Sequence, residues 1–138
     1  MRLSIILYAL ELTSETTEFY VDVNEKKTVF IDDLINSDEQ KEEFYLMLSK
    51  GNYISLPSLY DINEFKMMEK FINMLDDDYI KDKLQHAISG KGAFRYFSDL
   101  VFTMGIRREW LAFRHSAYKS CAIDFCENNG LEYDDDVK

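Results

Sequence analysis

Histidine and cysteine, on which many enzymes and metal sites depend, are scarce in this chain. Its 138 residues include two of each. Neither histidine lies in a recognisable nucleophile motif, so the sequence gives little support to hydrolase chemistry. Two histidines and two cysteines without close paired spacing do not form a zinc site, and the aspartate runs at 76–78 and 134–136 lack the glycine and spaced ligands of a calcium loop. We therefore expect neither a bound metal nor a cofactor.

Long apolar runs are also missing. The segment 1–10 could begin a secretion signal, but Glu11 interrupts it early and no small-residue cleavage site follows. Roughly 18 consecutive apolar residues would be needed to span a membrane. Cys121 and Cys126 are five positions apart in an expected helix, an offset that disfavours a disulfide or a shared metal and favours reduced, structural thiols. We therefore expect a cytoplasmic protein.

Nothing in the chain marks a division into domains. It has one proline and five glycines, and it contains no internal repeat, no low-complexity tract and no linker. Hydrophobic residues make up 46% of the sequence and aromatic residues 14%, which is typical of a globular protein. A chain of this length can bury one real core. We expect a single globular domain over residues 1–131 and a solvated acidic tail over residues 132–138.

The first half of the chain is expected to hold a helix and a small sheet. Leucine and isoleucine recur with helical spacing from Leu3 to Leu10, which predicts a helix ending near Thr13. Apolar, β-branched and aromatic residues then predict two strands, at 18–23 and 27–31, that form a hairpin. A third strand at 53–56 would complete an antiparallel sheet.

Capping signals predict the helices on either side of the third strand. Ser37 or Asp38 would cap a short acidic helix reaching Leu48. After the strand, Asp61 and Glu64 match the reciprocal pairing of a capping box, and apolar residues at helical spacing follow. We therefore expect a helix to begin at Asp61.

The second half is expected to be all-helical. The aspartates at 76–78 would open a helix that Gly90 stops, and further helices would run from about 93 to 104 and from about 107 to 127. The sequence therefore predicts an α+β fold. In it, a small antiparallel sheet, made of a hairpin plus one strand, packs with about five to six helices.

The run at 89–97 concentrates glycine, positive charge and aromatic side chains. Two glycines flank Lys91, and they could end one helix and start the next while leaving backbone N–H groups free for an anion. The run lacks the spacer and ending of a Walker A loop and does not follow a strand as a dinucleotide fingerprint would. A structural interpretation has Phe94 and Phe97 anchoring the next helix in the core. The alternative is an anion or partner site in which Lys91 and Arg95 supply the charge.

Positive charge is concentrated in the part of the chain that contains this run. Residues 79–119 hold eight Lys and Arg against three Asp and Glu, although the whole chain has a net charge of −10. A turn of about 100° per residue brings Arg108, His115 and Lys119 to one side of the last expected helix as an outward basic column. Ordinary solvated charge is the alternative, because a dedicated nucleic-acid binder has a more basic face. The candidate binding residues are therefore Lys91, Gly92, Arg95, Arg108, His115 and Lys119.

The same run is the centre of a family resemblance. Residues 90–97 read Gly-x-Gly-Ala-Phe-Arg-x-Phe and are followed by Gly105, Trp110 and the Cys-Glu-Asn-Asn-Gly segment at 126–130. Together these residues resemble the bacterial uncharacterised protein family (UPF) 0158, over nearly the whole chain. One departure is the hairpin turn at 24–27, where relatives tend to have a glycine. The resemblance implies a small, bacterial, cytosolic domain of mixed α and β structure, and it supplies no reaction.

Two functions from different classes remain open. The first is a non-enzymatic binding or regulatory module that recognises a protein or an anionic ligand at Lys91, Arg95 and the basic column; a variant has the acidic first half mimicking a nucleic acid. The second is an enzyme, or a binder, that takes a small phosphorylated or carboxylated molecule at residues 90–95. An enzyme would need a pocket beside that loop containing a carboxylate with a raised pKa. Neither nucleic acid nor membrane is expected as a partner.

Overall fold

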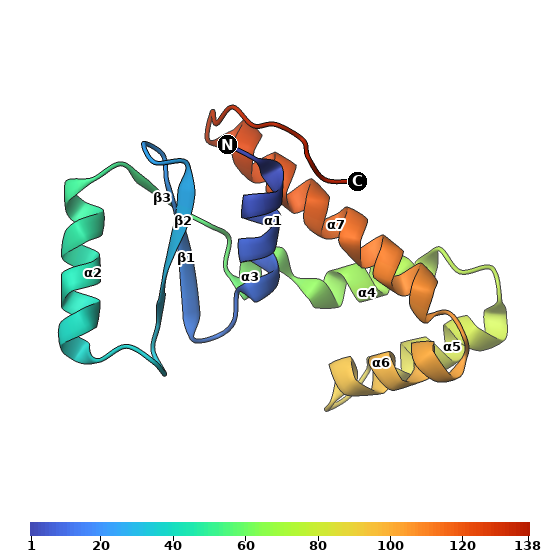
Figure 1. Ribbon diagram of the computed structural model, residues 1–138. Coiled ribbons are helices and arrows are strands. Elements are labelled where there is room, and N and C mark those ends of the chain that lie inside the picture. Colours follow the sequence, from blue (N-terminus) through green and yellow to red (C-terminus); the bar gives the residue numbers. More distant parts are fainter. The chain divides into compact units, whose positions relative to one another are not determined.

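The computed structural model describes all 138 residues and divides into two compact units (Figure 1). Unit 1 comprises Met1–Ile62 and Tyr118–Lys138, and unit 2 comprises Asn63–Ala117. A three-stranded antiparallel sheet lies in unit 1, and the C-terminal half of the chain is helical, so the predicted α+β fold is confirmed. The long helix α7 (Arg107–Asn128) contributes residues to both units. The assignment of residues 1–131 to one domain stays a prediction.

The sheet has β1 at its centre. β1 (Thr17–Asp22) pairs antiparallel with β2 (Lys27–Asp32) on one side and with β3 (Tyr53–Ser55) on the other. This arrangement is the predicted hairpin plus one strand. Because β3 has only three residues, it covers only the second half of β1.

In the hairpin turn, a hydrogen bond to a side chain stabilises a conformation that glycine would otherwise adopt. Lys26 has a φ of 56°, in the left-handed region that glycine adopts at least cost. Its N–H donates to the Asp22 carbonyl (2.9 Å), and the Glu25 N–H donates to Asp22 Oδ1 (3.1 Å). The buried Asp22 thus fixes both ends of the turn in the absence of the glycine expected from relatives.

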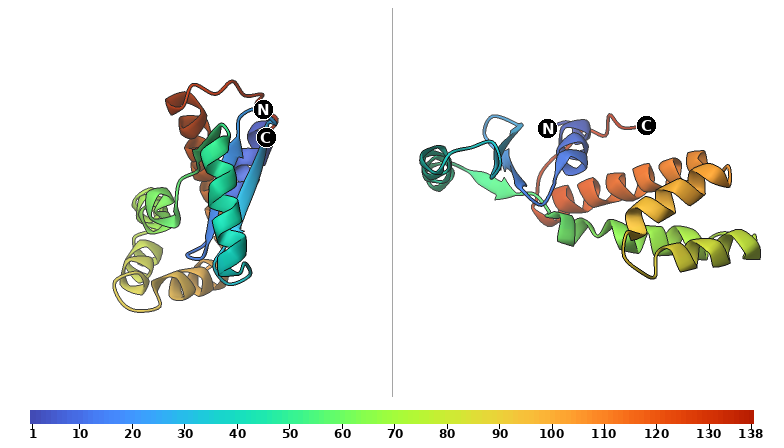
Figure 2. Two further views of the ribbon diagram at one scale, coloured as in Figure 1. Left: turned by 90° about the vertical axis from the view of Figure 1, so that its left-hand side faces the viewer. Right: turned by 90° about the horizontal axis from the view of Figure 1, so that it is seen from below.

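Two helices cover the sheet of unit 1, one on each face (Figures 1 and 2). α1 (Leu3–Leu12) buries five apolar residues and forms the main core with β1, which contributes Phe19 and Val21. α2 (Asp38–Lys50) has no buried residue. Ser37 caps α2 in a capping box with Gln40, which confirms the predicted start. The Phe44 ring of α2 lies 5.8 Å from the ring of Tyr20 in β1, centroid to centroid.

Residues 132–138 differ from the solvated tail that the sequence led us to expect. The Leu3 N–H donates to the Asp134 carbonyl (2.9 Å), and the Asp134 N–H donates to the Met1 carbonyl (2.8 Å). The Ser4 N–H donates to Asp136 Oδ1 (2.8 Å). The acidic segment is therefore hydrogen-bonded along the start of the chain, through the backbone of Asp134 and the carboxylate of Asp136.

Unit 2 is held together by a cluster of aromatic rings. It contains α4 (Glu64–Asn73), α5 (Asp78–Ala87), α6 (Ala93–Thr103) and the first half of α7. The Phe71 ring of α4 lies 5.4 Å from Trp110 of α7, and the Phe97 ring of α6 lies 4.8 Å from Trp110. Arg114 Nε donates to Glu64 Oε1 at 2.6 Å, which ties α7 to α4. Three helices thus meet at one aromatic centre.

The predicted helix start at Asp61 is wrong. Asp61 lies in the four-residue helix α3 (Leu59–Ile62), where its Oδ2 accepts from the Ser58 N–H at 3.1 Å, and its own N–H donates to Ser58 Oγ. α4 begins only after Asn63, which has a φ of 53° and accepts from the Lys66 N–H at 3.1 Å. Ser58 and Asp61 have the spacing of a capping box, so the reciprocal pair forms one element earlier than expected. Asp77 caps α5, as the aspartate run indicated.

Candidate functional site

The loop between α5 and α6 turns on Gly92. This residue has a φ of 72° and serves as the N-cap of α6 without any side-chain hydrogen bond. A Cβ atom at this position would be 3.4 Å from the Tyr96 ring, so the backbone conformation, not space, requires glycine here. Gly90 has no such conformation, and α5 already ends at Ala87, so the expected role of Gly90 as the helix stop is wrong.

The exposed side chains around Gly92 include both positive charges and aromatic rings. Lys91 and Arg95 are exposed, and neither has a carboxylate within ion-pair distance. Phe94 is 54% exposed and Tyr96 is 58% exposed. We call these four residues the α6 surface.

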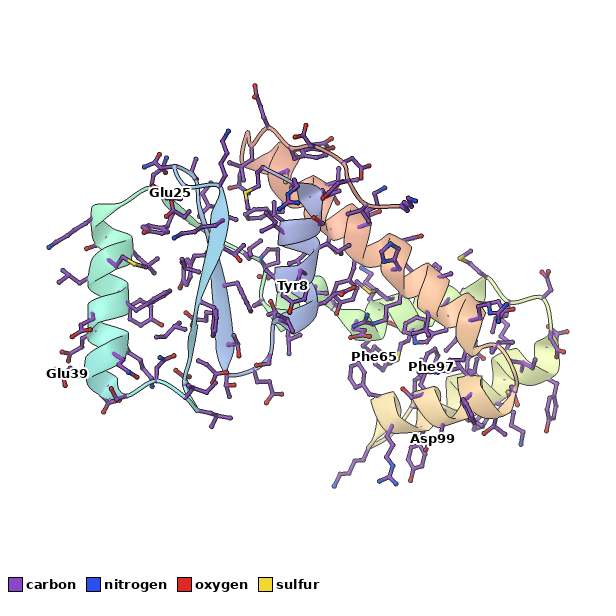
Figure 3. All side chains as sticks on the ribbon, viewed as in Figure 1. Tyr8, Glu25, Glu39, Phe65, Phe97 and Asp99 are labelled. Atoms are coloured by element: carbon purple, nitrogen blue, oxygen red, sulfur yellow. The ribbon has the colours of Figure 1, made fainter.

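The expectation that both phenylalanines of the run anchor α6 is half right. Phe97 is 1% exposed and packs in the aromatic cluster, whereas Phe94 remains more than half exposed. Figure 3 shows Phe97 on the side of α6 that faces the other helices of unit 2, and Asp99 on the opposite side. Phe94 precedes Phe97 by three residues and Val101 by seven, so all three lie on one side of α6, and Phe94 is the one in the first turn of the helix.

The basic column is not one continuous exposed surface. Lys119 Nζ pairs with Asp135 Oδ2 at 3.0 Å and donates to the Val137 carbonyl at 2.9 Å, so this side chain is used by the C-terminal segment. His115 is half-buried and has contacts of its own. Arg108 is exposed and lines a hollow of about 410 Å³ at the start of α7.

The structure also separates Arg108 from the α6 surface. Lys91 and Gly92 precede the 11 residues of α6, and Arg108 follows them. A helix of that length spans about 16 Å at 1.5 Å per residue. Lys91, Gly92 and Arg95 are therefore neighbours in one loop and the first turn of α6, whereas Arg108 lies at the other end of that helix.

Carboxyl groups with a shifted pKa lie elsewhere. The hydroxyl of Thr17 and the Leu34 N–H lower the pKa of Asp32, the Lys119 ammonium lowers that of Asp135, and Ser4 lowers that of Asp136. All three aspartates belong to unit 1, and all three shifts are downward. None of them is the raised carboxylate that an enzyme at residues 90–95 would need as an acid or base.

A cavity in unit 1 escaped the sequence analysis. It has a volume of about 460 Å³ and lies where β1 extends beyond the short β3, next to α3. The last hydrogen bond of this edge joins the Leu56 N–H to the Phe19 carbonyl (3.0 Å), and Pro57 then has no N–H to continue it. The lining of the cavity includes Glu15, Glu18 and Asp61. Only the length of β3 could have signalled this cavity, because its walls are far apart in sequence.

Other features bear on the class of protein. Cys121 and Cys126 are both free thiols, and burial raises the pKa of Cys126. No set of three or more His, Cys, Asp and Glu side chains is placed to hold a metal ion. None of the helices combines the length and the apolar character needed to cross a bilayer.

Comparison with known proteins identifies the family but no characterised relative. Neither a curated protein nor a solved structure matches the chain. A family model described as "Uncharacterised protein family (UPF0158)" matches residues 1–136. Since the match spans almost every element described above, the chain belongs to this uncharacterised family.

Proposed function

We propose that the protein is a small, non-enzymatic binding module and that its α6 surface contacts an acidic segment of a protein partner. The observation that carries this proposal is the exposure of Lys91 and Arg95, without ion pairs, beside the exposed rings of Phe94 and Tyr96. Arginine and aromatic side chains dominate the binding energy of many protein interfaces. An acidic segment would supply the carboxylates that these two cations lack.

Two further observations favour binding over catalysis. The carboxyl groups with a shifted pKa all shift downward, so none of them is the carboxyl with a raised pKa that an acid–base enzyme would use. The exposed rings of Phe94 and Tyr96 extend the charged surface with apolar area, which suits a protein segment better than a small polar substrate. We also propose a bacterial, cytoplasmic setting, in keeping with the family resemblance and with two free cysteines.

Charge reversal tests the proposal. Proteins captured from bacterial lysate by the wild type would be compared with those captured by Lys91→Glu/Arg95→Glu and by Phe94→Ala/Tyr96→Ala. Lys66→Glu/Lys70→Glu is the matched control, because both lysines are exposed in α4 of the same unit. We expect both α6 variants to lose an acidic partner that the wild type and the control retain. Identical partners for all four proteins would contradict the proposal.

A small anionic ligand at the same place is the second candidate. Gly92 supplies no side-chain acceptor to the first turn of α6, whose N–H groups lie beside Lys91 and Arg95. A ligand that binds only the native state raises thermal stability by mass action. Screening phosphorylated metabolites and nucleotides by thermal shift would favour this candidate if one of them stabilises the wild type and not Arg95→Glu.

A further inference from the structure

The outer edge of β2 is open. The Leu56 N–H donates to the Phe19 carbonyl (3.0 Å), so odd-numbered residues of β1 bond toward β3 and even-numbered ones toward β2. In β2, likewise, alternate residues direct their backbone N–H and C=O groups toward β1 and away from it. Thr28 and Phe30 face the odd-numbered residues of β1, and their N–H and C=O groups therefore point away from the sheet.

At both ends of the open edge of β2, backbone groups are already hydrogen-bonded within the chain. The Asp32 N–H donates to Asn36 Oδ1 (2.9 Å), and the Asp32 carbonyl accepts from the Asn36 N–H (2.9 Å). At the other end, the Lys26 N–H donates within the hairpin turn (2.9 Å). The open edge is thus limited to Thr28 and Phe30, which offer one donor and one acceptor each.

We propose that β2 pairs antiparallel with β2 of a second copy of this chain across a twofold axis. Pairing Thr28 with Phe30 of the second copy satisfies both residues in both copies, and it places the two Val29 residues opposite each other on the axis. Centring the pair on Phe30 instead would bring Thr28 against Asp32, whose backbone groups Asn36 already occupies. Centring the pair on Thr28 would bring Phe30 against Lys26, whose N–H is held in the hairpin turn. The two closed ends therefore select one register, and the product is a six-stranded sheet.

The side chains fit a second copy in this register. In this register the turn that carries Lys26 meets the end of β2 that carries Asp32 of the second copy, and the twofold axis repeats this meeting of opposite charges at the other end. Phe30, which is 53% exposed, gains the neighbouring strand as cover. Unit 1 has seven Lys and Arg against 18 Asp and Glu, so two copies repel each other at long range. Association should therefore strengthen as salt screens this repulsion.

Disulfide trapping tests the register. In a Cys121→Ser/Cys126→Ala background, Val29→Cys should form a covalent dimer on mild oxidation, because residues facing each other on the axis bring their Cβ atoms close. Leu34→Cys is the matched control: Leu34 is 82% exposed, yet it lies in the turn after Asp32, and two copies of Asp32 would be about 20 Å apart along the strands. Linkage of Leu34→Cys as readily as of Val29→Cys would overturn the proposal.

Sedimentation equilibrium tests self-association through the β2 edge without a cross-link. The wild type should dimerise reversibly, and more strongly at high salt. Thr28→Pro removes a donor that is not used within the chain and should weaken self-association about tenfold or more, because the symmetric contact loses this bond twice. Thr28→Val keeps the donor and should leave association unchanged. A wild type that stays monomeric at every concentration and salt would overturn the proposal.

Discussion

Phe94 and Phe97 lie in one short motif and have opposite environments. Phe97 is 1% exposed, with its ring 4.8 Å from Trp110, whereas Phe94 is 54% exposed. The difference follows from their positions along α6: Phe94 lies in the first turn of the helix, whereas Phe97 and Val101 lie further along it and are buried. One phenylalanine therefore serves the fold, and the other is available to a partner.

Truncating each phenylalanine should separate these roles. Phe97→Ala should lower the free energy of unfolding by about 3–5 kcal/mol, as expected for a large core side chain. Phe94→Ala should change it by less than about 0.5 kcal/mol, because the side chain is mostly solvated. Urea denaturation followed by circular dichroism measures both. Equal losses would mean that Phe94 is part of the core.

Replacing each of the two glycines of the motif by alanine should change the free energy of unfolding in opposite directions. Gly92 has a φ of 72°, so Gly92→Ala should lower the free energy of unfolding by about 1–2 kcal/mol. A Cβ atom added at Gly90 would meet no other atom within 4 Å, and the φ of Gly90 is not positive, so Gly90→Ala should raise stability by up to about 1 kcal/mol. Thermal and urea unfolding of the pair checks this. A loss at Gly90 would show that its conformation also needs glycine.

The charge of the α6 surface was predictable from sequence, and its exposure only in part. Lys91 and Arg95 stood out because they are basic residues in an acidic chain. The exposure of Phe94 was not predictable, since aromatic residues are more often buried and its spacing to Phe97 and Val101 places it on the buried side of the helix. The commitment of Lys119 to the C-terminal segment depends on Asp135, a contact that periodicity cannot reveal.

At the scale of elements, α2 is attached to the rest of unit 1 by few contacts. It buries no residue, and its links include the Phe44 and Tyr20 rings, a hydrogen bond of 3.0 Å from Tyr45 to Glu18, and an ion pair of 3.2 Å between Lys41 and Asp33. Glu18 also accepts from Tyr20 at 2.9 Å. The Glu18 carboxylate of β1 therefore joins α2 to the sheet through the Tyr45 phenol, and it also accepts from the Tyr20 phenol of its own strand.

High pH should loosen this attachment. Burial, and then the hydrogen bond to Glu18, raises the pKa of Tyr20 to about 12 from 10.0, and the same causes raise the pKa of Tyr45. A phenol whose pKa rises on folding stabilises the native state below its unfolded value and loses that contribution as pH climbs through the folded value. The free energy of unfolding should therefore fall between about pH 10 and 12. Tyrosinate absorbance should develop at lower pH in Glu18→Gln; an unchanged titration would contradict this.

Acid should release the C-terminal segment. The Lys119 ammonium lowers the pKa of Asp135, and the Ser4 hydroxyl lowers that of Asp136, from 3.8. A carboxyl whose pKa falls on folding stabilises the native state above its unfolded value, and this contribution disappears as pH drops below about 3.8.

Asp136→Asn should weaken docking at neutral pH as well. Hydrogen exchange of the Ser4 amide, which donates to Asp136, should be faster in Asp136→Asn than in the wild type. Glu132→Gln is the matched control, since this exposed residue makes no hydrogen bond or ion pair in the segment. Equal protection of Ser4 in all three proteins would show that the aspartate does not hold the segment.

Most elements of the fold could be predicted because they depend on local patterns. The hairpin, α2 and the helices after residue 77 follow from apolar spacing and capping residues within each segment. Two features of the fold could not be predicted from local patterns. The start of α4 was misplaced because Asp61 fits a capping box with Ser58 as well as with Glu64. The docking of residues 134–136 joins two distant parts of the sequence, and no local pattern encodes it.

At the scale of the whole molecule, charge differs sharply between the two units. Unit 1 holds seven Lys and Arg against 18 Asp and Glu, whereas unit 2 holds nine against eight. Like charges repel within unit 1 and oppose its compact state, whereas unit 2 is nearly balanced. The net charge of −10 is therefore a property of unit 1.

Salt should stabilise the two units unequally. Raising ionic strength screens repulsion between exposed charges, so it should slow hydrogen exchange in α1 and β1 of unit 1. Amides of α4 and α6 in unit 2 should change much less. Exchange would be followed by mass spectrometry on dilute protein, so that self-association does not contribute. Equal slowing in both units would contradict an origin in the charge of unit 1.

The order in which the chain is synthesised differs from the order in which its units can be completed. Unit 1 needs residues from both sides of unit 2: Tyr118, Ala122 and Cys126 are buried, and they follow every residue of unit 2. Unit 2 is continuous and ends at Ala117. During translation, the second unit along the chain is therefore the first for which all residues have been made. The core of unit 1, the unit that contains the sheet, can be completed only after the end of α7 has been synthesised.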